Sequence, residues 1–301
     1  MSVLLMTVWL TGCVQEEFES TPSPAGNGIR FTLTVPDVNL PSVSSRTMTG
    51  TGTAKKEDEI ETVDILVFDM SKTPAVFLEW VSATGVTQDL ADNSTVSFSA
   101  VLSPTTASTC IVVVANKELD NIVSGFTKGA TTKVEAMEKM LHTQTGKWLA
   151  DGSTTGGYTR IPMYGEKVIS KITPSMNPIT DINMKRMLAR IDIRNNSVTS
   201  NFTVEEVYLA NYNTTGYIAP AWNTNGQVTE PAPDTPVLPT GSGKMTEEGN
   251  AILYSVNGNT PYDGEIYTFE SLAAGDAGGA GQDGEASRKD ATCLIVKGKI
   301  G

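Results

Sequence analysis

The chain has 301 residues, which is enough for two domains that each bury a core of their own. Acidic residues outnumber basic ones by 34 to 22, and the resulting net charge of −12 argues against binding nucleic acid by neutralising phosphates. Only 19% of the residues are charged, while Thr, Ser, Gly and Asn are abundant. This composition is typical of extracellular β-rich proteins.

The N-terminus carries a short apolar run, residues 2–10, which leads directly into Leu10-Thr11-Gly12-Cys13. This pattern resembles the lipobox, at which a signal peptidase cuts before a cysteine that receives a diacylglycerol. We therefore expect residues 1–12 to be a lipoprotein signal peptide and Cys13 to carry the lipid. No Lys or Arg precedes the run, and a lone cysteine in an ordinary leader is the alternative. A transmembrane helix would need about 20 apolar residues.

The first predicted strand covers residues 29–35, where apolar and polar side chains alternate. Its apolar face consists of Ile29, Phe31, Leu33 and Val35. A polar loop rich in Ser, Thr and Gly follows, and it contains Arg46 and Thr47. Proteases act at exposed loops of this composition, so a cut between Arg46 and Thr47 would release the first strand; a plain connecting loop is the alternative.

More strands are predicted along the rest of the chain. The predicted ranges are residues 63–68, 96–101, 111–115, 187–193, 204–209, 252–256, 266–269 and 294–296. Residues 223–244 and 273–284, rich in Pro, Thr or Gly, are interpreted as surface segments. Many strands and little helix favour a β-sandwich architecture.

One short helix is predicted after Thr132, which has capping-box spacing to Glu135. Its apolar face would be formed by Val134, Met137, Met140 and Leu141. We expect this helix to cover an edge or end of a sheet and to end before Gly146. His142 would then lie in its last turn, where a partly positive imidazole interacts favourably with the helix dipole.

The sequence offers little for catalysis. His142 is the single histidine, so a catalytic triad could be built only around it. No cluster of His or Cys has the spacing of a zinc site, and we expect neither a metal nor a cofactor. Gly279 to Gly284 match a dinucleotide fingerprint but lack a flanking strand and helix, and Met245 replaces the hydroxyl residue that a phosphate loop needs after Lys244. The chain is therefore not expected to be an enzyme.

Cysteines and tryptophans leave alternatives open. Cys110 and Cys293 are interpreted as two buried free thiols, with a disulfide between them as the alternative. Aromatic side chains can form a stacking platform for sugars or belong to the core, and for this chain we favour the core. The candidates are Trp80, Trp148 and Trp222.

Several segments together resemble the fimbrillins of Bacteroidales pili. After the lipobox, the first strand and the loop with Arg46 come Asp58-Glu59-Ile60-Glu61-Thr62-Val63-Asp64-Ile65-Leu66-Val67-Phe68-Asp69. Val112-Val113-Val114-Ala115-Asn116, Ile161-Pro162-Met163-Tyr164-Gly165 and Met187-Leu188-Ala189-Arg190-Ile191-Asp192-Ile193 follow in the expected order. Tyr267-Thr268-Phe269-Glu270 and residues 294–299 extend the resemblance over nearly the whole chain.

The resemblance implies two tandem transthyretin-like β-sandwich domains, at residues 47–183 and 184–301, after an N-terminal extension at residues 13–46. It also implies an outer-membrane lipoprotein of the cell surface that is cut by an arginine-specific protease. The first strand would be a placeholder, and another fimbrial subunit would fill its groove with a strand of its own. A host or bacterial surface ligand is a further implied partner. A surface lipoprotein that binds glycans is the alternative function.

The resemblance further implies that additional strands, including the donated one, follow Gly301. The C-terminal domain would then be incomplete in the present chain, or the protein would accept a strand without donating one.

Overall fold

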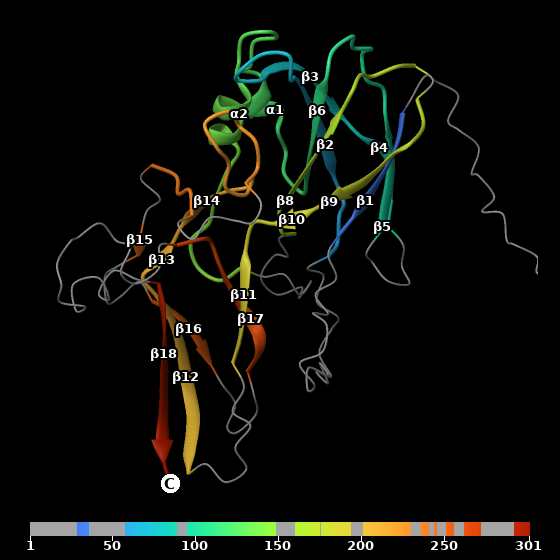
Figure 1. The fold of residues 1–301 in the computed structure, drawn as a ribbon. Helices are drawn as coiled ribbons and strands as arrows, with labels where there is room; N and C mark the ends of the chain where they lie inside the picture. Colours follow the sequence, from blue (N-terminus) through green and yellow to red (C-terminus); the bar gives the residue numbers. More distant parts are fainter. Residues whose placement is uncertain are drawn as a thin grey trace, which may run out of the picture.

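The computed structural model describes residues 29–35, 58–88, 95–148, 160–174, 176–193, 201–229, 236–240, 244–245, 251–255, 262–271 and 292–301. Cys13, Arg46, Thr47 and the glycines of both motifs lie outside these residues. The described part of the chain is mainly β, as predicted, and Figure 1 shows its strands in several separate sheets. Every predicted strand range contains a strand.

Two sheets pack face to face within residues 29–186, here called the first half, and the residues that follow are called the second half. One sheet, here called the β1 sheet, has the order β4 (Thr84–Gln88), β5 (Thr95–Ala100), β1 (Ile29–Thr34) and β9 (Ile179–Asn183). The other, here called the central sheet, has the order β10 (Lys185–Arg186), β8 (Met163–Ile169), β6 (Thr109–Ala115), β2 (Val63–Asp69) and β3 (Val76–Ser82).

The central sheet is buried on both faces, which explains the continuous apolar runs at residues 65–68 of β2 and 110–115 of β6. Alternate side chains of β2 belong to different core clusters: Ile65 and Val67 face the β1 sheet, whereas Leu66 and Phe68 face the opposite side. A strand covered on one face needs only alternating apolar residues, while a strand covered on both faces needs continuous ones. The sequence pattern of each strand thus records how many of its faces are covered.

Helix α2 (Lys133–Lys139) covers the second face of the central sheet. Its capping box is present, because Thr132 Oγ1 accepts a hydrogen bond from the Glu135 amide and Glu135 Oε2 accepts one from the Thr132 amide. The helix lies beside the edge strand β3, as expected for a helix at a sheet edge, and Ala136 and Met137 are fully buried in the cluster on the sheet's second face. Among the described residues there is a second, four-residue helix, α1 (Asp120–Val123), which buries no residue and therefore left no apolar periodicity to detect.

The predicted helix ends too late by several residues. Met140 leaves the helical conformation, and β7 (Leu141–Thr143) pairs with β14 (Thr215–Tyr217) from the second half of the chain. His142 therefore lies in a strand and not in a last helical turn. The apolar residues at positions 140 and 141 reflect this tertiary pairing, which overrides the local helical pattern.

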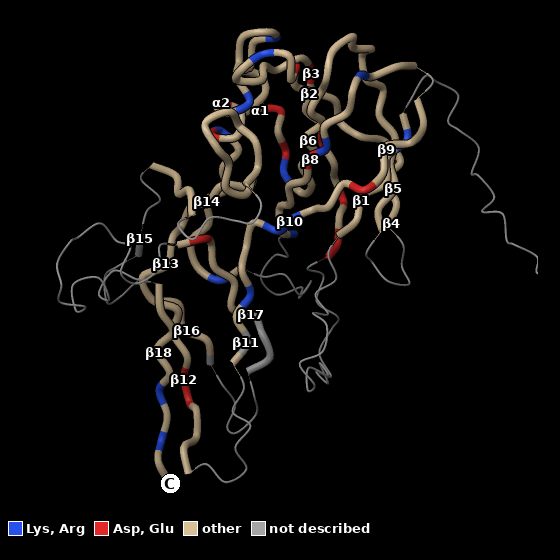
Figure 2. The backbone as a smooth tube through the Cα atoms, viewed as in Figure 1, with Lys and Arg blue, Asp and Glu red and all other residues tan. Residues whose placement is uncertain are grey.

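The second half extends away from the first and ends in a long edge strand (Figure 1). Its sheets are β16 (Ile252–Ser255), β12 (Phe202–Ala210) and β18 (Cys293–Ile300); β11 (Ala189–Ile193) with β17 (Tyr262–Thr268); and β13 (Tyr212–Asn213) with β15 (Lys244–Met245). Figure 2 shows basic residues of β18 beside acidic residues of β12. Lys297 pairs with Glu206 at 2.8 Å, and Lys299 pairs with Glu205.

The two halves share one core cluster. Leu66 and Val112 of the central sheet belong to the same cluster as Ile218, Tyr267 and Phe269. Residues 223–229 were interpreted as part of a surface segment. Asn223, Thr224, Asn225 and Gln227 are exposed, as interpreted, whereas Gly226 is buried and Val228 packs against that cluster. The division into domains at residue 184 stays a prediction, and any such division must cross this shared cluster.

Candidate assembly site

Strand β1 is an internal strand of its sheet. It pairs antiparallel with β5 over its full length, from Ile29 opposite Ala100 to Thr34 opposite Thr95. On its other side it pairs parallel with β9, and that register slips between Phe31 and Leu33. The slip coincides with Asp181 in β9, whose φ of 58° marks the extra residue of a bulge. Removing β1 would therefore separate β5 from β9 and expose two strand edges.

The apolar face predicted for β1 is buried. The exposed fractions of Ile29, Phe31, Leu33 and Val35 are 4%, 0%, 0% and 1%. These side chains pack into a cluster with residues of β5, β9, β2 and β6, while Thr34 on the other face is exposed. The ring of Phe31 stacks on that of Phe98 in β5, with centroids 5.0 Å apart and planes 7° apart.

The two packed sheets approach closely beside β1. A Cβ atom on Gly165 of β8 would lie 2.7 Å from the Met184 sulfur and 2.9 Å from a methyl carbon of Ile182, so only glycine fits this position. The Met184 amide in turn donates a hydrogen bond to the Thr34 carbonyl at 2.9 Å. The residue that follows β9 thus holds the end of β1 through its backbone.

The buried face of β1 contacts the rest of the protein through apolar side chains. Among the described residues, every member of the cluster around β1 is aliphatic, aromatic or methionine. A different strand could replace β1 without having to satisfy any buried polar side chain in that cluster. This arrangement is suited to binding a strand and offers no group for chemistry.

The opposite side of the central sheet is different, because it buries a charge. Lys133, the first residue of α2, is 1% exposed. Its ammonium group donates hydrogen bonds to Glu166 Oε2 of β8 and to the Gly226 carbonyl, each at 2.6 Å. The Tyr164 hydroxyl donates a hydrogen bond to the same Glu166 oxygen at 2.6 Å. The pKa of Tyr164 is raised, mainly by burial and to a smaller extent by the nearby Glu166 charge.

The Cys110 thiol is not an activated nucleophile. Cys110 is fully buried, and burial raises the pKa of its thiol to about 12, so it stays protonated. Both Cys110 and Cys293 are free thiols, as interpreted from the sequence, although Cys293 is only half-buried and not buried as expected.

His142 is a half-buried residue packed against aromatic rings. Burial, helped by the charge of Lys117, lowers the pKa of His142 to about 4 despite a hydrogen bond with Gln144. The expectation that its imidazole carries a partial positive charge is therefore wrong. The ring lies 4.9 Å from that of Trp148 and 6.4 Å from that of Phe269.

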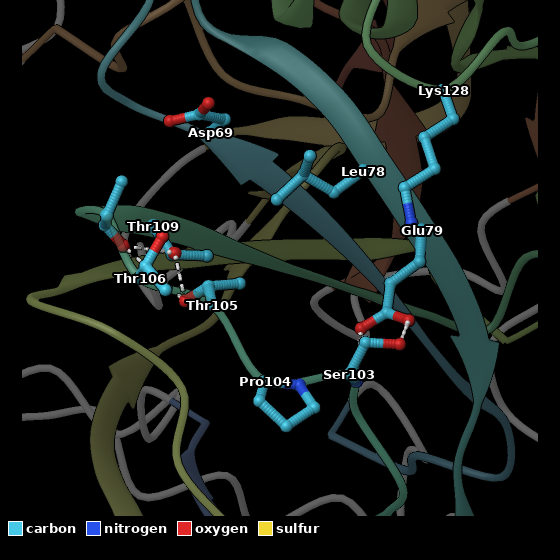
Figure 3. A pocket seen from close by; sticks show the side chains of 10 residues that line it. Asp69, Leu78, Glu79, Ser103, Pro104, Thr105, Thr106, Thr109 and Lys128 are labelled. Carbon is cyan, nitrogen blue, oxygen red and sulfur yellow. Dashed lines mark hydrogen bonds between the residues drawn. The ribbon is translucent and has the colours of Figure 1, made fainter.

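A pocket of about 240 Å³ lies where β2, β3 and the segment before β6 meet (Figure 3). Its polar groups bond mainly to one another: Glu79 accepts hydrogen bonds from the amide and hydroxyl of Ser103 at 2.7 and 2.6 Å, and the hydroxyls of Thr105 and Thr109 lie 2.9 Å apart. It is smaller than most ligand pockets, which measure roughly 300 to 1,000 Å³. We assign it no function.

The three candidate tryptophans lie in or against the shared core cluster. Trp148 is 3% exposed, and Trp80 and Trp222 are partly buried against the same cluster, which favours the core interpretation. No group of three or more metal-ligating side chains occurs within the described ranges. Neither α1 nor α2 is long and apolar enough to cross a membrane, and the search covered the described residues alone.

Residues 29–186 match the family of the major fimbrial subunit protein (FimA), which is just over half of the chain. The chain therefore belongs to this family. The match begins at Ile29, the first residue of β1, and ends just after β9, so it spans the β1 sheet and the central sheet. Membership supports a pilus subunit or adhesin that acts at the cell surface with other fimbrial subunits, and not an enzyme.

Three solved structures are similar to this fimbrial subunit. A fimbrial assembly protein of Parabacteroides distasonis is 11% identical with a TM-score of 0.41, covering 91% of this chain and 82% of its own. A candidate cell adhesion protein of the same species is 18% identical with a TM-score of 0.43, covering 83% and 73%. A candidate adhesin of Bacteroides ovatus is 14% identical with a TM-score of 0.35, covering 81% and 68%. No curated protein matches the chain in sequence.

Some residues of this site could not be found from the sequence. Strand β9 was missed because its bulge places Ile179 and Ile182 three residues apart, which breaks the alternation that marks a strand. Lys133 was missed because a lysine in the first turn of a short helix ordinarily points into solvent. The pairing of Phe31 with Phe98 depends on strand register, which no local pattern reveals.

Proposed function

We propose that this fimbrial subunit is exported as a lipoprotein anchored through Cys13 and assembles by strand exchange. In this proposal a protease cuts between Arg46 and Thr47, β1 leaves, and a strand from another subunit takes its place. The observation that carries the proposal is the position of β1. Strand β1 lies between β5 and β9, and its four apolar side chains are buried. In the sequence, residues 36–57, which include Arg46, connect it to the strands that follow.

Energetics support the exchange. Burying a Val, Leu, Ile or Phe side chain contributes roughly 1.5 to 3 kcal/mol, and β1 buries four of them. The empty site would also leave the backbone groups of β5 and β9 unpaired, which favours recruitment of a new strand. Before the cut, β1 satisfies these groups within the same chain and keeps the subunit monomeric.

Lipid anchoring is tested by Cys13→Ala, with Cys110→Ala as the matched control because Cys110 is buried in the core. The Cys13 variant should lose lipid labelling and leave the detergent phase, whereas the Cys110 variant should keep both properties. A Cys13→Ala protein that stays in the detergent phase would show that another feature anchors the chain.

Processing is tested by Arg46→Ala, Arg46→Lys and N-terminal sequencing of subunits from assembled fibres. Both variants should remain monomeric if the protease requires arginine, and fibres of the unchanged protein should contain subunits that begin at Thr47. Fibres whose subunits still contain residues 29–35 would contradict the proposal. The Lys variant separates loss of cleavage from loss of positive charge.

A further inference from the structure

The place occupied by β1 contains an aromatic slot. The cluster around β1 has two aromatic members among the described residues, Phe31 and Phe98, and their rings stack on each other. Their exposed fractions are 0% and 2%, so the pair is sealed from solvent. If β1 left, Phe98 would lose its only ring partner within the described part of the cluster, and one face of its ring would line the empty groove.

Neighbouring positions along β5 present different surfaces. Ile29 lies opposite Ala100, Phe31 opposite Phe98 and Leu33 opposite Val96. The small Ala100 leaves room for a branched side chain, whereas Phe98 offers a flat ring. Directly opposite residues on one face of a sheet form the contacts that set pairing preferences, and aromatic pairs are among the stronger ones.

We propose that this groove selects an incoming strand with the pattern apolar-x-aromatic-x-apolar-x-apolar, in which the aromatic residue is placed on Phe98. The inference rests on the strand exchange proposed above and adds a specificity-determining residue, Phe98, and the class of strand that it accepts. The occupant is an extended segment of another fimbrial subunit that runs antiparallel to β5. A strand with aliphatic residues at all four positions would fill the groove incompletely, because the slot has the shape of a ring.

Register follows from the same feature. Aliphatic side chains of similar size allow a strand to slide by two residues without turning its apolar face outward. An aromatic residue that fits one position and not its neighbours removes this freedom. The slot therefore fixes the register of the incoming strand as well as its identity.

The test uses full-length protein nicked after Arg46 by an arginine-specific protease and a fluorescent peptide with the sequence of residues 29–35. Unlabelled peptides compete for the groove. The decisive competitor carries Phe31→Leu together with Leu33→Phe, since it has the same composition and places the aromatic residue opposite Val96. We expect it to bind at least tenfold more weakly than the unchanged peptide, and the single change Phe31→Leu to weaken binding by a similar factor.

The Phe98→Leu change in the protein tests whether Phe98 causes this preference. In nicked Phe98→Leu protein, the preference for the unchanged peptide over the swapped one should fall below about threefold, while circular dichroism reports whether the variant is folded. Equal binding of the unchanged and swapped peptides to the unchanged protein would overturn the aromatic slot and leave strand exchange intact. If no peptide enters the nicked protein, strand exchange and the slot are both wrong.

Discussion

The two faces of the central sheet are covered in different ways. On one face, the β1 sheet contacts it through a cluster of apolar side chains. On the other face, α2 and residues 218–228 contact it through a cluster that adjoins a buried ammonium group, a carboxylate and a phenol. An apolar contact accepts any strand of suitable shape, whereas a buried ion pair is satisfied in few arrangements.

This difference matches what each face has to do in a subunit that assembles by exchanging β1. The β1 side must release one strand and accept another, and it does so without leaving a buried charge unpaired. The α2 side joins the two halves of the chain, because Lys133 and Glu166 from the first half contact Gly226 and Val228 from the second. We therefore expect the α2 side to stay rigid while the β1 side exchanges.

Lys133→Met should have the largest effect on the α2 side. Removing one partner of a buried pair leaves the other uncompensated, and we expect a loss of about 3–5 kcal/mol in the free energy of unfolding. Urea unfolding of the variant measures this loss. Lys171→Met is the matched control, since Lys171 is exposed, and it should change stability by less than about 0.5 kcal/mol.

The double variant Lys133→Met with Glu166→Gln tests whether the unpaired Glu166 charge causes this loss. It removes both charges, so part of the loss should be recovered and the two changes should not be additive. A Lys133→Met protein as stable as the unchanged one would mean that this contact does not hold the halves together.

Phe31→Ala probes the β1 side in the uncut protein. Truncating a buried Phe to Ala costs about 3–5 kcal/mol, and we expect a value within this range. Thr32→Ala, on the other face of β1, is the control and should have little effect. Hydrogen exchange should report faster opening of β1 in the Phe31 variant, with the amides of α2 unchanged. Equal acceleration in α2 would mean that the two faces open together.

His142 gives a smaller, pH-dependent effect on the α2 side. The folded state holds its pKa near 4, below the ordinary value of 6.5, so below pH 6.5 the unfolded chain binds more protons than the folded one. The contribution of His142 to the free energy of unfolding is therefore fully present above pH 6.5 and is lost as the pH decreases towards 4. The full difference corresponds to about 3 kcal/mol, and because His142 is part-exposed we discount it to about 1–2 kcal/mol.

Thermal unfolding between pH 4 and 7 measures this dependence. Since His142 is the single histidine of the chain, His142→Phe removes the titration without leaving another of its kind. The variant should show a flatter dependence over this range. A dependence as steep as in the unchanged protein would assign it to carboxylates instead.

Sequence patterns predicted the β1 side better than the α2 side. Alternation over residues 29–35 follows from a strand with one buried face, and the continuous apolar run at residues 65–68 follows from burial on both faces. Both signals are local. The contacts of the α2 side join residues far apart in the chain, such as Lys133 with Gly226 and His142 with Gly216, and local periodicity carries no information about them. This is why the end of α2, the contact of Val228 with the shared cluster and the role of Lys133 were not predicted.

Thr132→Ala should have the smallest effect and tests whether the two faces are independent. The Thr132 hydroxyl caps α2 by accepting a hydrogen bond from the Glu135 amide at 3.2 Å, and loss of such a cap costs about 1 kcal/mol. Thr132→Ser keeps the oxygen and should retain most of that stability, so the pair isolates the cap from the size of the side chain. Because Thr132 precedes Lys133, loosening this turn should weaken the contact with Gly226 and speed hydrogen exchange in α2.

The cluster around β1 contains no residue of α2 among the described residues. Binding of the peptide with the sequence of residues 29–35 to nicked protein should therefore be the same in the Ala and Ser variants. A difference of more than about threefold between them would mean that the α2 side controls strand exchange and that the faces are coupled through the central sheet.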